Sequence, residues 1–135
     1  MFDQHTYLYV EDDALSRIAM KTIFERVLKS NGLTIFSDSA DFMQRVRSLP
    51  ARPEVFMLDI HVEPHSGFEM LEMLRSDPDY TGATVVALTA SVMNEEIERL
   101  RTAGFDSTIA KPLIVHQFPQ LMRQILNGEP VWHIA

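Results

Sequence analysis

The stretch Thr6–Phe36, TYLYVEDDALSRIAMKTIFERVLKSNGLTIF, contains the pattern that decides the fold. Two short apolar runs, Thr6–Val10 and Leu33–Phe36, flank a longer segment whose apolar residues have helical spacing. Both runs are apolar nearly throughout instead of alternating with polar residues, which is typical of strands covered on both faces in a parallel sheet. The stretch therefore predicts a strand, a helix and a second strand parallel to the first.

The segment between the two runs is predicted to be a helix over residues 14–28. Its apolar residues recur at helical spacing, and we expect this stripe to face the sheet. The stripe consists of Leu15, Ile18, Ala19, Ile23 and Val27. Asp13 directly precedes the helix, and because Asp is a preferred N-cap residue we expect it to cap the helix. Asn31-Gly32 ends the segment before the second strand.

The same alternation continues through the rest of the chain. Three more apolar runs predict strands, namely Val55–Leu58, Thr84–Leu88 and the weaker Ser107–Ala110. Helical patterns separate the strands and follow the last one, at Phe42–Leu49, Phe68–Leu74, Ile97–Ala103 and Leu121–Leu126. Five strand–helix repeats joined by right-handed crossovers predict an α/β fold, a doubly wound open parallel sheet with helices on both faces.

Length and composition limit the possible functions. A chain of 135 residues is expected to form one domain over 1–135, with a core of about 6–126 and a tail at 127–135. The net charge of −7 makes it a poor match for nucleic acid or an anionic membrane. The absence of cysteine excludes disulfides and thiolate metal sites. No apolar stretch is long enough for a signal peptide or a membrane span, so we expect a cytoplasmic protein.

Chemically capable side chains follow four of the predicted strands. Glu11 and Asp12 follow the first, Asp59 the third, Thr89 the fourth and Lys111 the fifth. Because ligands of open α/β sheets bind at the carboxyl ends of the strands, these residues are expected to meet. Clustered carboxylates repel one another, and Mg²⁺, which prefers oxygen ligands, would relieve that repulsion.

The hydroxyl and the amine in this set suit a phosphoryl group. Lys111 can act as a positive charge and Thr89 as a hydroxyl donor. Phosphoryl transfer needs little beyond positioning and neutralisation of charge. Asp59 stands alone at its strand end, so it is the expected nucleophile, forming an acyl phosphate.

Four segments resemble the receiver domain of two-component response regulators. They are YVEDDALSR (9–17), FMLDIHVEPHSGFEML (56–71), VVALTA (85–90) and AGFDSTIAKP (103–112), and the resemblance runs from about Tyr7 to Leu126. It implies a flavodoxin-like three-layer sandwich in which the five strands have the order 2-1-3-4-5. Thr89 lies 30 residues after Asp59, and Lys111 lies 22 residues after Thr89, as the family pattern expects.

The resemblance also implies residue roles. Asp59 matches the phospho-acceptor, Glu11 and Asp12 the acidic pair that holds Mg²⁺, and His61 the position whose backbone carbonyl binds the metal. Thr89 matches the switch hydroxyl and Lys111 the family's amine, while the Lys111-Pro112 bond is commonly cis in the family. The implied partners are a sensor histidine kinase or a histidine phosphotransfer protein, which donates the phosphoryl group, and a downstream protein of unknown identity.

Two positions depart from the family pattern. Glu63 stands where the family usually has proline, and Pro64 follows it, so the loop beside the site is expected to differ in shape. Thr108 stands where the family usually has an aromatic residue that turns inward on activation. The loop Ile60–Gly67 is therefore an alternative place for the response to phosphorylation.

The preferred hypothesis is a phospho-accepting receiver in a phosphorelay, which is not an enzyme beyond autophosphorylation or autodephosphorylation. A stand-alone regulator and a receiver from a hybrid kinase both remain open. The main alternative is a pseudo-receiver that binds proteins without regulated phosphorylation. A Mg²⁺-dependent aspartyl-phosphate phosphohydrolase is disfavoured, because His61 stands where those enzymes need an acidic residue. A nucleotide-binding flavodoxin-like protein is disfavoured because no glycine-rich phosphate loop is present.

Two further segments allow more than one interpretation. His61, Glu63 and His65 are close enough in sequence to suggest a transition-metal site, but a solvated polar loop is the preferred interpretation. The apolar tail Val131–Ile134 can pack back on the domain, contact a partner or mark the point where a longer protein was divided.

Overall fold

The computed structural model describes residues 1–91 and 93–132. Its centre is a parallel sheet of five strands in the order β2-β1-β3-β4-β5, which confirms the predicted fold class and strand order. The strands are β1 (Tyr7–Val10), β2 (Leu33–Phe36), β3 (Val55–Asp59), β4 (Thr84–Thr89) and β5 (Ser107–Ala110). Each lies within about one residue of its predicted bounds, because an uninterrupted apolar run is a clear signal for a strand buried on both faces.

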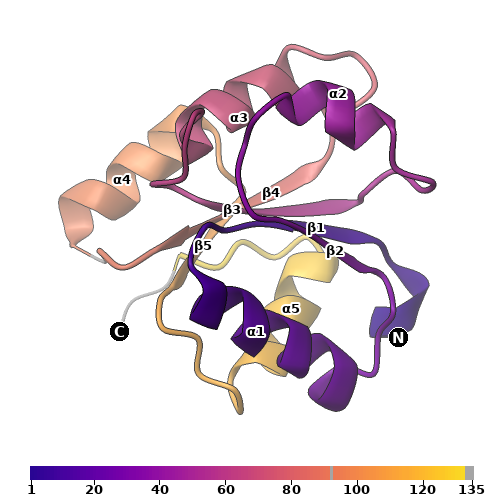
Figure 1. Cartoon of the computed structure of the whole chain (residues 1–135). Helices are drawn as coiled ribbons and strands as arrows, with labels where there is room; N and C mark the ends of the chain where they lie inside the picture. Colours follow the sequence, from indigo (N-terminus) through magenta and orange to yellow (C-terminus); the bar gives the residue numbers. More distant parts are fainter. Residues whose placement is uncertain (92, 133–135) are drawn as a thin grey trace.

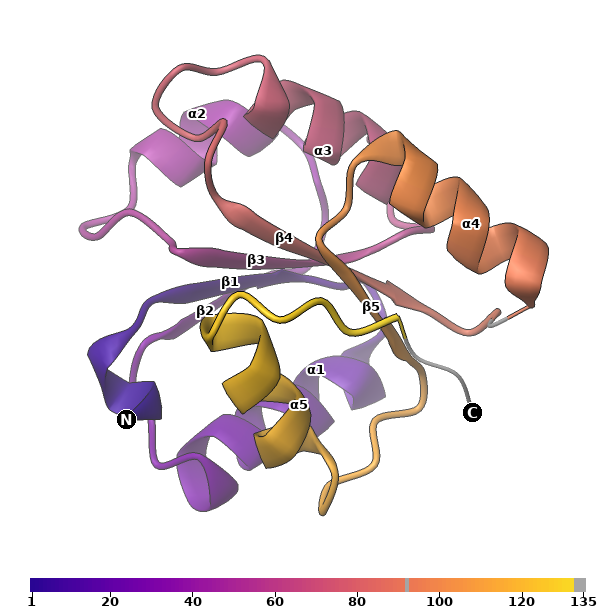
Figure 2. The same cartoon turned by 180° about the vertical axis from the view of Figure 1, so that it is seen from behind.

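Helices cover both faces of the sheet (Figures 1 and 2). α1 (Ala14–Thr22) continues as the π-helical turn η2 (Ile23–Val27), and it shares one face with α5 (Phe118–Leu126). α2 (Phe42–Arg47), α3 (Gly67–Arg75) and α4 (Asn94–Ala103) cover the other face, and the short 3-10 turn η1 (Phe2–Gln4) precedes β1. None of the helices in the described part of the chain has the length and apolar character needed to cross a membrane.

The sheet divides the interior into two cores. One core lies between the sheet and α2–α4 and includes Phe42, Phe56 and Leu71. The other lies between the sheet and α1 and α5 and includes Phe24 and Met122. Because successive strand residues point to opposite faces, β1, β3 and β4 each contribute apolar side chains to both cores, whereas β5 contributes only Ile109, to the core under α1 and α5.

The apolar stripe predicted for the first helix is wrong except at Ile23, which is buried as expected. Leu15 and Ile18 are 77% and 62% exposed, and the buried face is instead formed by Met20, Ile23, Phe24 and Leu28. Both sets have nearly helical spacing, and the second contains an aromatic ring, which has more apolar area to bury. The Phe24 ring packs edge-on against Tyr7 at a centroid distance of 4.8 Å.

The π-helical turn helps the second set to reach the core. The N–H of Leu28 donates to the carbonyl of Ile23, five residues earlier, so this last turn is wider than an α-helical one. At the other end of α1 the prediction is confirmed, because the Asp13 side chain accepts a hydrogen bond from the N–H of Ser16 at 2.8 Å. This cap fixes the start of the helix at Ala14, two residues after Asp12.

The tail packs back on the domain as far as it is described. Gly128 has a positive φ of 78°, which reverses the chain after α5. The N–H of Thr108 in β5 then donates to the carbonyl of Val131 at 2.7 Å, and Trp132 pairs with the same strand residue. The remaining tail residues, His133 to Ala135, lie outside the described residues.

Candidate functional site

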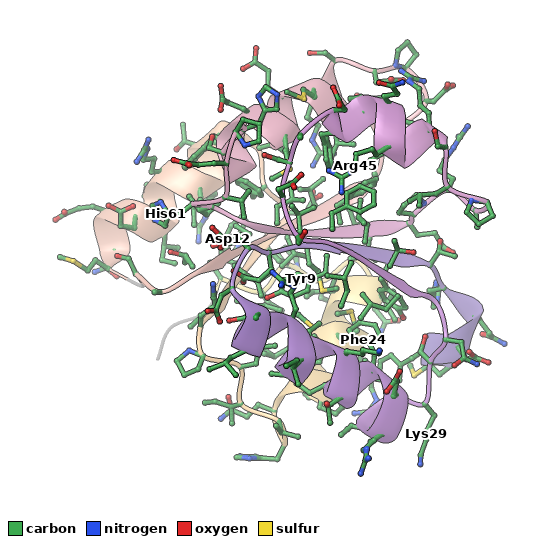
Figure 3. All side chains as sticks on the ribbon, viewed as in Figure 1. Tyr9, Asp12, Phe24, Lys29, Arg45 and His61 are labelled. Atoms are coloured by element: carbon green, nitrogen blue, oxygen red, sulfur yellow. The ribbon has the colours of Figure 1, made fainter. Side chains whose placement is uncertain are left out.

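The predicted site residues meet at the carboxyl edge of the sheet. Glu11 and Asp12 follow β1, Asp59 ends β3, Thr89 ends β4 and Lys111 follows β5. Figure 3 shows Asp12 and His61 at this edge, on the side opposite Lys29 at the far end of the first helix. The parallel register brings the strand ends level, because Val10 pairs with Leu58, and Leu58 with Ala87. The fold therefore places residues from four strands around one point.

Three carboxylates form the acidic part of the site. Glu11, Asp12 and Asp59 each offer an oxygen atom, and these atoms lie within 4.8 Å of one another. Glu11 is fully buried and Asp59 is 5% exposed, whereas Asp12 is open to solvent. The cluster thus has two buried members and one that a solvated ion or ligand can reach first.

Lys111 is the cation that faces this cluster. Its Nζ lies 2.8 Å from Oε1 of Glu11 and 3.6 Å from Oδ1 of Asp59. The backbone N–H of Lys111 donates to the carbonyl of Thr89 at 2.8 Å, so the end of β4 holds the lysine in place. The peptide bond between Lys111 and Pro112 is cis, as the family resemblance implied.

Tyr9 is a site residue that the sequence reasoning missed. Its hydroxyl donates to Oε1 of Glu11 at 2.7 Å, and the ring is 1% exposed. Tyr9 and Glu11 are two residues apart along the chain, so their side chains point to the same face. The spacing of two residues between Tyr9 and Glu11 was the signal in the sequence that could have identified Tyr9 as a site residue. Glu11 Oε1 therefore accepts from both Tyr9 and Lys111.

The two buried carboxyl groups have opposite pKa shifts. Burial raises the pKa of Asp59 to about 6, and the nearby negative charge of Glu11 adds to this effect. Burial also acts to raise the pKa of Glu11, but hydrogen bonds from Lys111 and Tyr9 outweigh it and hold that pKa below its usual value. Glu11 is therefore the more stable anion of the two, and its negative charge destabilises the ionised form of Asp59.

The ammonium group of Lys111 is stabilised by the same contacts. Burial acts to lower its pKa, whereas the hydrogen bond to Glu11 and the negative charge of Asp59 raise it, and the net shift is upward. Lys111 consequently stays protonated beside the carboxylates at neutral pH. A positive charge held there can neutralise an anionic ligand.

Thr89 borders the site through its side chain, whereas His61 borders it through its backbone. Thr89 is 4% exposed, and its Oγ1 accepts a hydrogen bond from the N–H of Ser91 at 3.1 Å, which leaves the hydroxyl proton available. The backbone N–H of His61 lies 3.5 Å from Oδ1 of Asp59, while its side chain is exposed. His61 thus borders the site through its backbone.

The loop between β3 and α3 is attached to the loop after β2 through Ser39. The hydroxyl of this buried serine donates to the carbonyl of His65 and accepts from the N–H of His65, both at 2.7 Å. The N–H of Ser39 donates to the carbonyl of Glu63 at 3.2 Å. Glu63 is exposed, and the Glu63-Pro64 bond is cis. The unusual segment predicted from the sequence is thus tied to a neighbouring loop.

The donor set fits a hard divalent cation. Mg²⁺ is held in proteins by one or two carboxylates, with water completing an octahedron of oxygen atoms. Asp12 and Asp59 offer carboxylates at short range, and burial together with the negative charge of Glu11 raises the pKa of Asp59, a shift that a bound cation would oppose. Among the described residues, this is the only group of three or more acidic or histidine side chains close enough to share an ion. His61, Glu63 and His65 form no such group.

The open five-stranded α/β sheet with acidic residues and a lysine at its carboxyl edge is the arrangement that the resemblance to receiver domains implied. The family model for the response regulator receiver domain matches residues 7–125. The chain therefore belongs to the response regulator receiver domain family.

Curated relatives are response regulators. The polar-differentiation response regulator DivK of Brucella anthropi is 32% identical over 76 residues, which cover 56% of this chain and 62% of that protein. DivK of Brucella ovis is 26% identical over 120 residues, or 89% of this chain and 94% of the relative. The first match thus spans less than two thirds of its relative, and the second spans nearly all of it.

Solved structures share the fold. The chemotaxis response regulator CheY4 of Vibrio cholerae has a TM-score of 0.79 at 16% identity, covering 90% of this chain and 98% of that one. The receiver domain of sensor histidine kinase PA1611 from Pseudomonas aeruginosa has a TM-score of 0.75 at 21% identity, covering 91% and 98%. That structure is described with a magnesium ion coordinated in its active-site cleft.

Proposed function

We propose that Asp59 accepts a phosphoryl group from a phosphohistidine in a two-component phosphorelay. One observation carries this proposal. The Asp59 carboxylate ends the central strand β3, with Lys111 3.6 Å away and two further carboxylates within 4.8 Å. A nucleophile with a fixed cation and a metal-binding acidic pair beside it has the parts that phosphoryl transfer requires.

In this proposal each residue has a separate task. A carboxylate oxygen of Asp59 attacks phosphorus, the phosphorus–nitrogen bond breaks and the imidazole leaves as the phosphoryl group becomes an acyl phosphate. Lys111 neutralises the phosphoryl oxygens, and Thr89 donates its hydroxyl proton to one of them. Glu11, Asp12, Asp59 and the carbonyl of His61 would hold Mg²⁺, which supplies further positive charge at the phosphoryl oxygens.

The raised pKa of Asp59 has a consequence for this chemistry. A protonated carboxyl is a poor nucleophile, so acceptance requires Asp59 to lose its proton above about pH 6. A cation beside the group favours its ionised form. Mg²⁺ at the acidic pair, together with Lys111, would therefore favour the ionised form of Asp59 before the reaction and neutralise the phosphoryl oxygens during the transfer.

A surface next to the site supports the proposal that the phosphoryl group comes from a protein. Leu15 and Ile18 are exposed on α1, which begins two residues after Asp12. Leu15, Lys111 and Pro112 line one hollow beside the acidic cluster. Exposed apolar side chains beside charged catalytic groups are typical of protein-binding surfaces. We propose that a sensor histidine kinase or a histidine phosphotransfer protein docks here in the cytoplasm.

Intact mass measurement tests the phosphorylation directly. Wild type treated with acetyl phosphate and Mg²⁺ should gain one phosphoryl mass, which hydroxylamine then removes. Asp59→Asn should never gain it. Asp79→Asn is the matched control, because this exposed aspartate precedes β4 at the other end of the sheet, and it should behave as wild type.

The main alternative is the pseudo-receiver, and Glu63 and Thr108 favour it. Glu63 adds a carboxylate to the loop beside the site, and Thr108 is a fully buried residue of β5 in place of an aromatic one. If the wild type stays at its unmodified mass with Mg²⁺ and donor in excess, the pseudo-receiver replaces the phospho-acceptor as the better hypothesis.

A further inference from the structure

The outer edge of β5 is covered by the chain's own residues Glu129–Trp132, which we call the strap. β5 is the last strand of the sheet, so its outer side has no neighbouring strand in the sheet. The N–H of Thr108 donates to the carbonyl of Val131 at 2.7 Å, and the N–H of Val131 donates to Oγ of Ser107 at 2.9 Å. Figure 2 shows the segment after α5 returning to this strand.

The strap puts its side chains into both layers of the domain. Val131 is 9% exposed and belongs to the core under α1 and α5. Trp132 is partly buried and packs against the core under α2–α4. The guanidinium of Arg101 in α4 lies 4.9 Å from the centre of the Trp132 ring. Trp132 also forms a parallel bridge with Thr108. The strap therefore occupies the edge as an added strand would.

These contacts describe what the edge of β5 recognises. Thr108 offers a backbone donor, which is fixed in position because the residue is fully buried. One side of the edge takes an aliphatic side chain, and the other takes an aromatic ring beneath the Arg101 guanidinium. A guanidinium over a ring favours aromatic over aliphatic side chains.

The strap is held by few contacts. Between described residues these are two hydrogen bonds to β5, one from the N–H of Glu129 to the carbonyl of Gln124 in α5, one cation–π contact and the apolar packing of two side chains. Segments with few buried contacts open at a lower free energy than the rest of a domain. Opening leaves the N–H of Thr108 without its acceptor, and a strand edge with such a donor pairs readily with another extended segment.

We propose that the outer edge of β5 is a docking surface for an extended segment of a partner protein. The segment runs parallel to β5 and carries an aliphatic residue followed by an aromatic one. Main-chain hydrogen bonds supply affinity and the two side-chain sites supply specificity, as in other cases of strand addition. The strap is the tethered competitor, so a partner must exceed its effective concentration, which is in the millimolar range for short linkers. This surface does not depend on phosphorylation of Asp59.

The peptide NGEPVW, which has the sequence of residues 127–132, is the probe. It is titrated into the ¹⁵N-labelled full chain carrying Trp132→Ala and into wild type. The amide resonances of Ser107 and Thr108 should shift in the variant, and wild type should need several-fold more peptide because the strap competes. A scrambled peptide should leave these resonances unchanged. Absence of shifts in β5 of the variant, or shifts confined to another surface, overturns the proposal.

Arg101 provides the specificity test. The peptide NGEPVL should bind the Trp132→Ala chain about two- to fivefold more weakly than NGEPVW. Adding Arg101→Ala should abolish this difference. Adding Arg99→Ala should preserve it, because Arg99 lies on the same helix but over the ring of Phe68 at 4.6 Å. Equal binding of both peptides, or a difference that survives Arg101→Ala, contradicts the assigned ring site.

Wild type supplies a measurement that does not need a folded variant. Trp132 is the only tryptophan in the chain, so the fluorescence of the protein reports on the strap. The tryptophan-free peptide NGEPVF at millimolar concentration should displace the strap and increase quenching of this fluorescence by acrylamide. Quenching that does not respond to the peptide overturns the competition between strap and partner.

Discussion

The hydroxyl of Tyr9 donates to Oε1 of Glu11 at 2.7 Å, from a ring that is itself buried. Glu11 has lost its water, and the only side-chain donors to Oε1 among the described residues are Tyr9 and Lys111. A buried carboxylate depends strongly on such donors, because each replaces hydration that folding removes. The acidic site is thus stabilised by Tyr9, a buried residue of β1, which is the strand that Glu11 follows.

Removing this donor should destabilise the protein. Tyr9→Phe is expected to lower the free energy of unfolding by about 1.5–3 kcal/mol, the usual range for a hydrogen bond to a charged group. Urea denaturation at neutral pH measures it. Tyr7→Phe is the matched control, since its hydroxyl donates to the neutral carbonyl of Phe2 and should cost about 1 kcal/mol. Equal losses in the two variants would show that the charge on Glu11 is not what Tyr9 stabilises.

Asp59 should make the metal-free protein less stable as pH rises. Its folded pKa of about 6 lies above the ordinary value of 3.8, so the folded state binds the proton more tightly. The resulting stabilisation is complete below about pH 4 and is lost as the pH rises to about 6. It amounts to about 3 kcal/mol for a shift of this size. Denaturation from pH 4 to 7 in EDTA measures the trend.

The contribution of Asp59 is the difference between wild type and Asp59→Asn, because other groups titrate in the same range. The variant should be the more stable protein at pH 7 and should lose less stability between pH 4 and 7. Parallel curves for the two proteins would rule out a raised pKa at this position.

Mg²⁺ should stabilise the folded protein through the acidic cluster. At ten times its dissociation constant it should add about 1.4 kcal/mol to the free energy of unfolding. This effect should weaken below about pH 6, where Asp59 takes up a proton. Asp12→Ala should abolish the Mg²⁺ effect in thermal melts, whereas Glu72→Gln, an exposed site on α3, should keep it. Melting temperatures that ignore Mg²⁺ in wild type would argue against a metal site here.

The response to phosphorylation is predicted to be concentrated in the loop Ile60–Gly67. Thr108 has no ring to move when the Thr89 hydroxyl turns toward a phosphoryl group. Amide exchange with and without beryllofluoride should therefore change most within Asp59–Gly67 and less within Ser91–Ala110. Ser39→Ala removes the side-chain hydrogen bonds to His65 and should enlarge the loop response. Ser37→Ala, two residues earlier and exposed, should not. Changes confined to Ser91–Ala110 would refute this expectation.

The strands and the site positions could be predicted from the sequence because their signals are local. A buried parallel strand is a continuous apolar run, and the residue that follows it lies at the functional edge. Asp59 and Lys111 could therefore be assigned to one edge from their positions along the chain. Their distances could not, because the pair Glu11–Lys111 is separated by 100 residues and depends on the packing of four strands.

Other features could not be predicted because the sequence allows two similar local arrangements, and the packing of the whole domain decides between them. Leu15 and Ile18 have the spacing of a buried stripe but are exposed, because Phe24 makes the better contact with Tyr7. Periodicity gives the width of an apolar face, but it does not decide between two candidate faces. Ser39 was not recognised for a related reason, since its role emerges only when two loops meet.

The division of the interior by the sheet has a thermodynamic consequence. Phe42 and Phe24 are both almost fully buried, but they lie in different cores on opposite sides of the strands. Truncating either to alanine should cost about 3–5 kcal/mol. Because the two side chains have no shared layer, a double-mutant cycle between them should give a coupling energy within about 0.5 kcal/mol of zero. Phe24 and Phe118, whose ring centroids are 6.0 Å apart in one core, should instead be measurably non-additive. The domain would then tolerate sequence drift in one layer without compensating changes in the other.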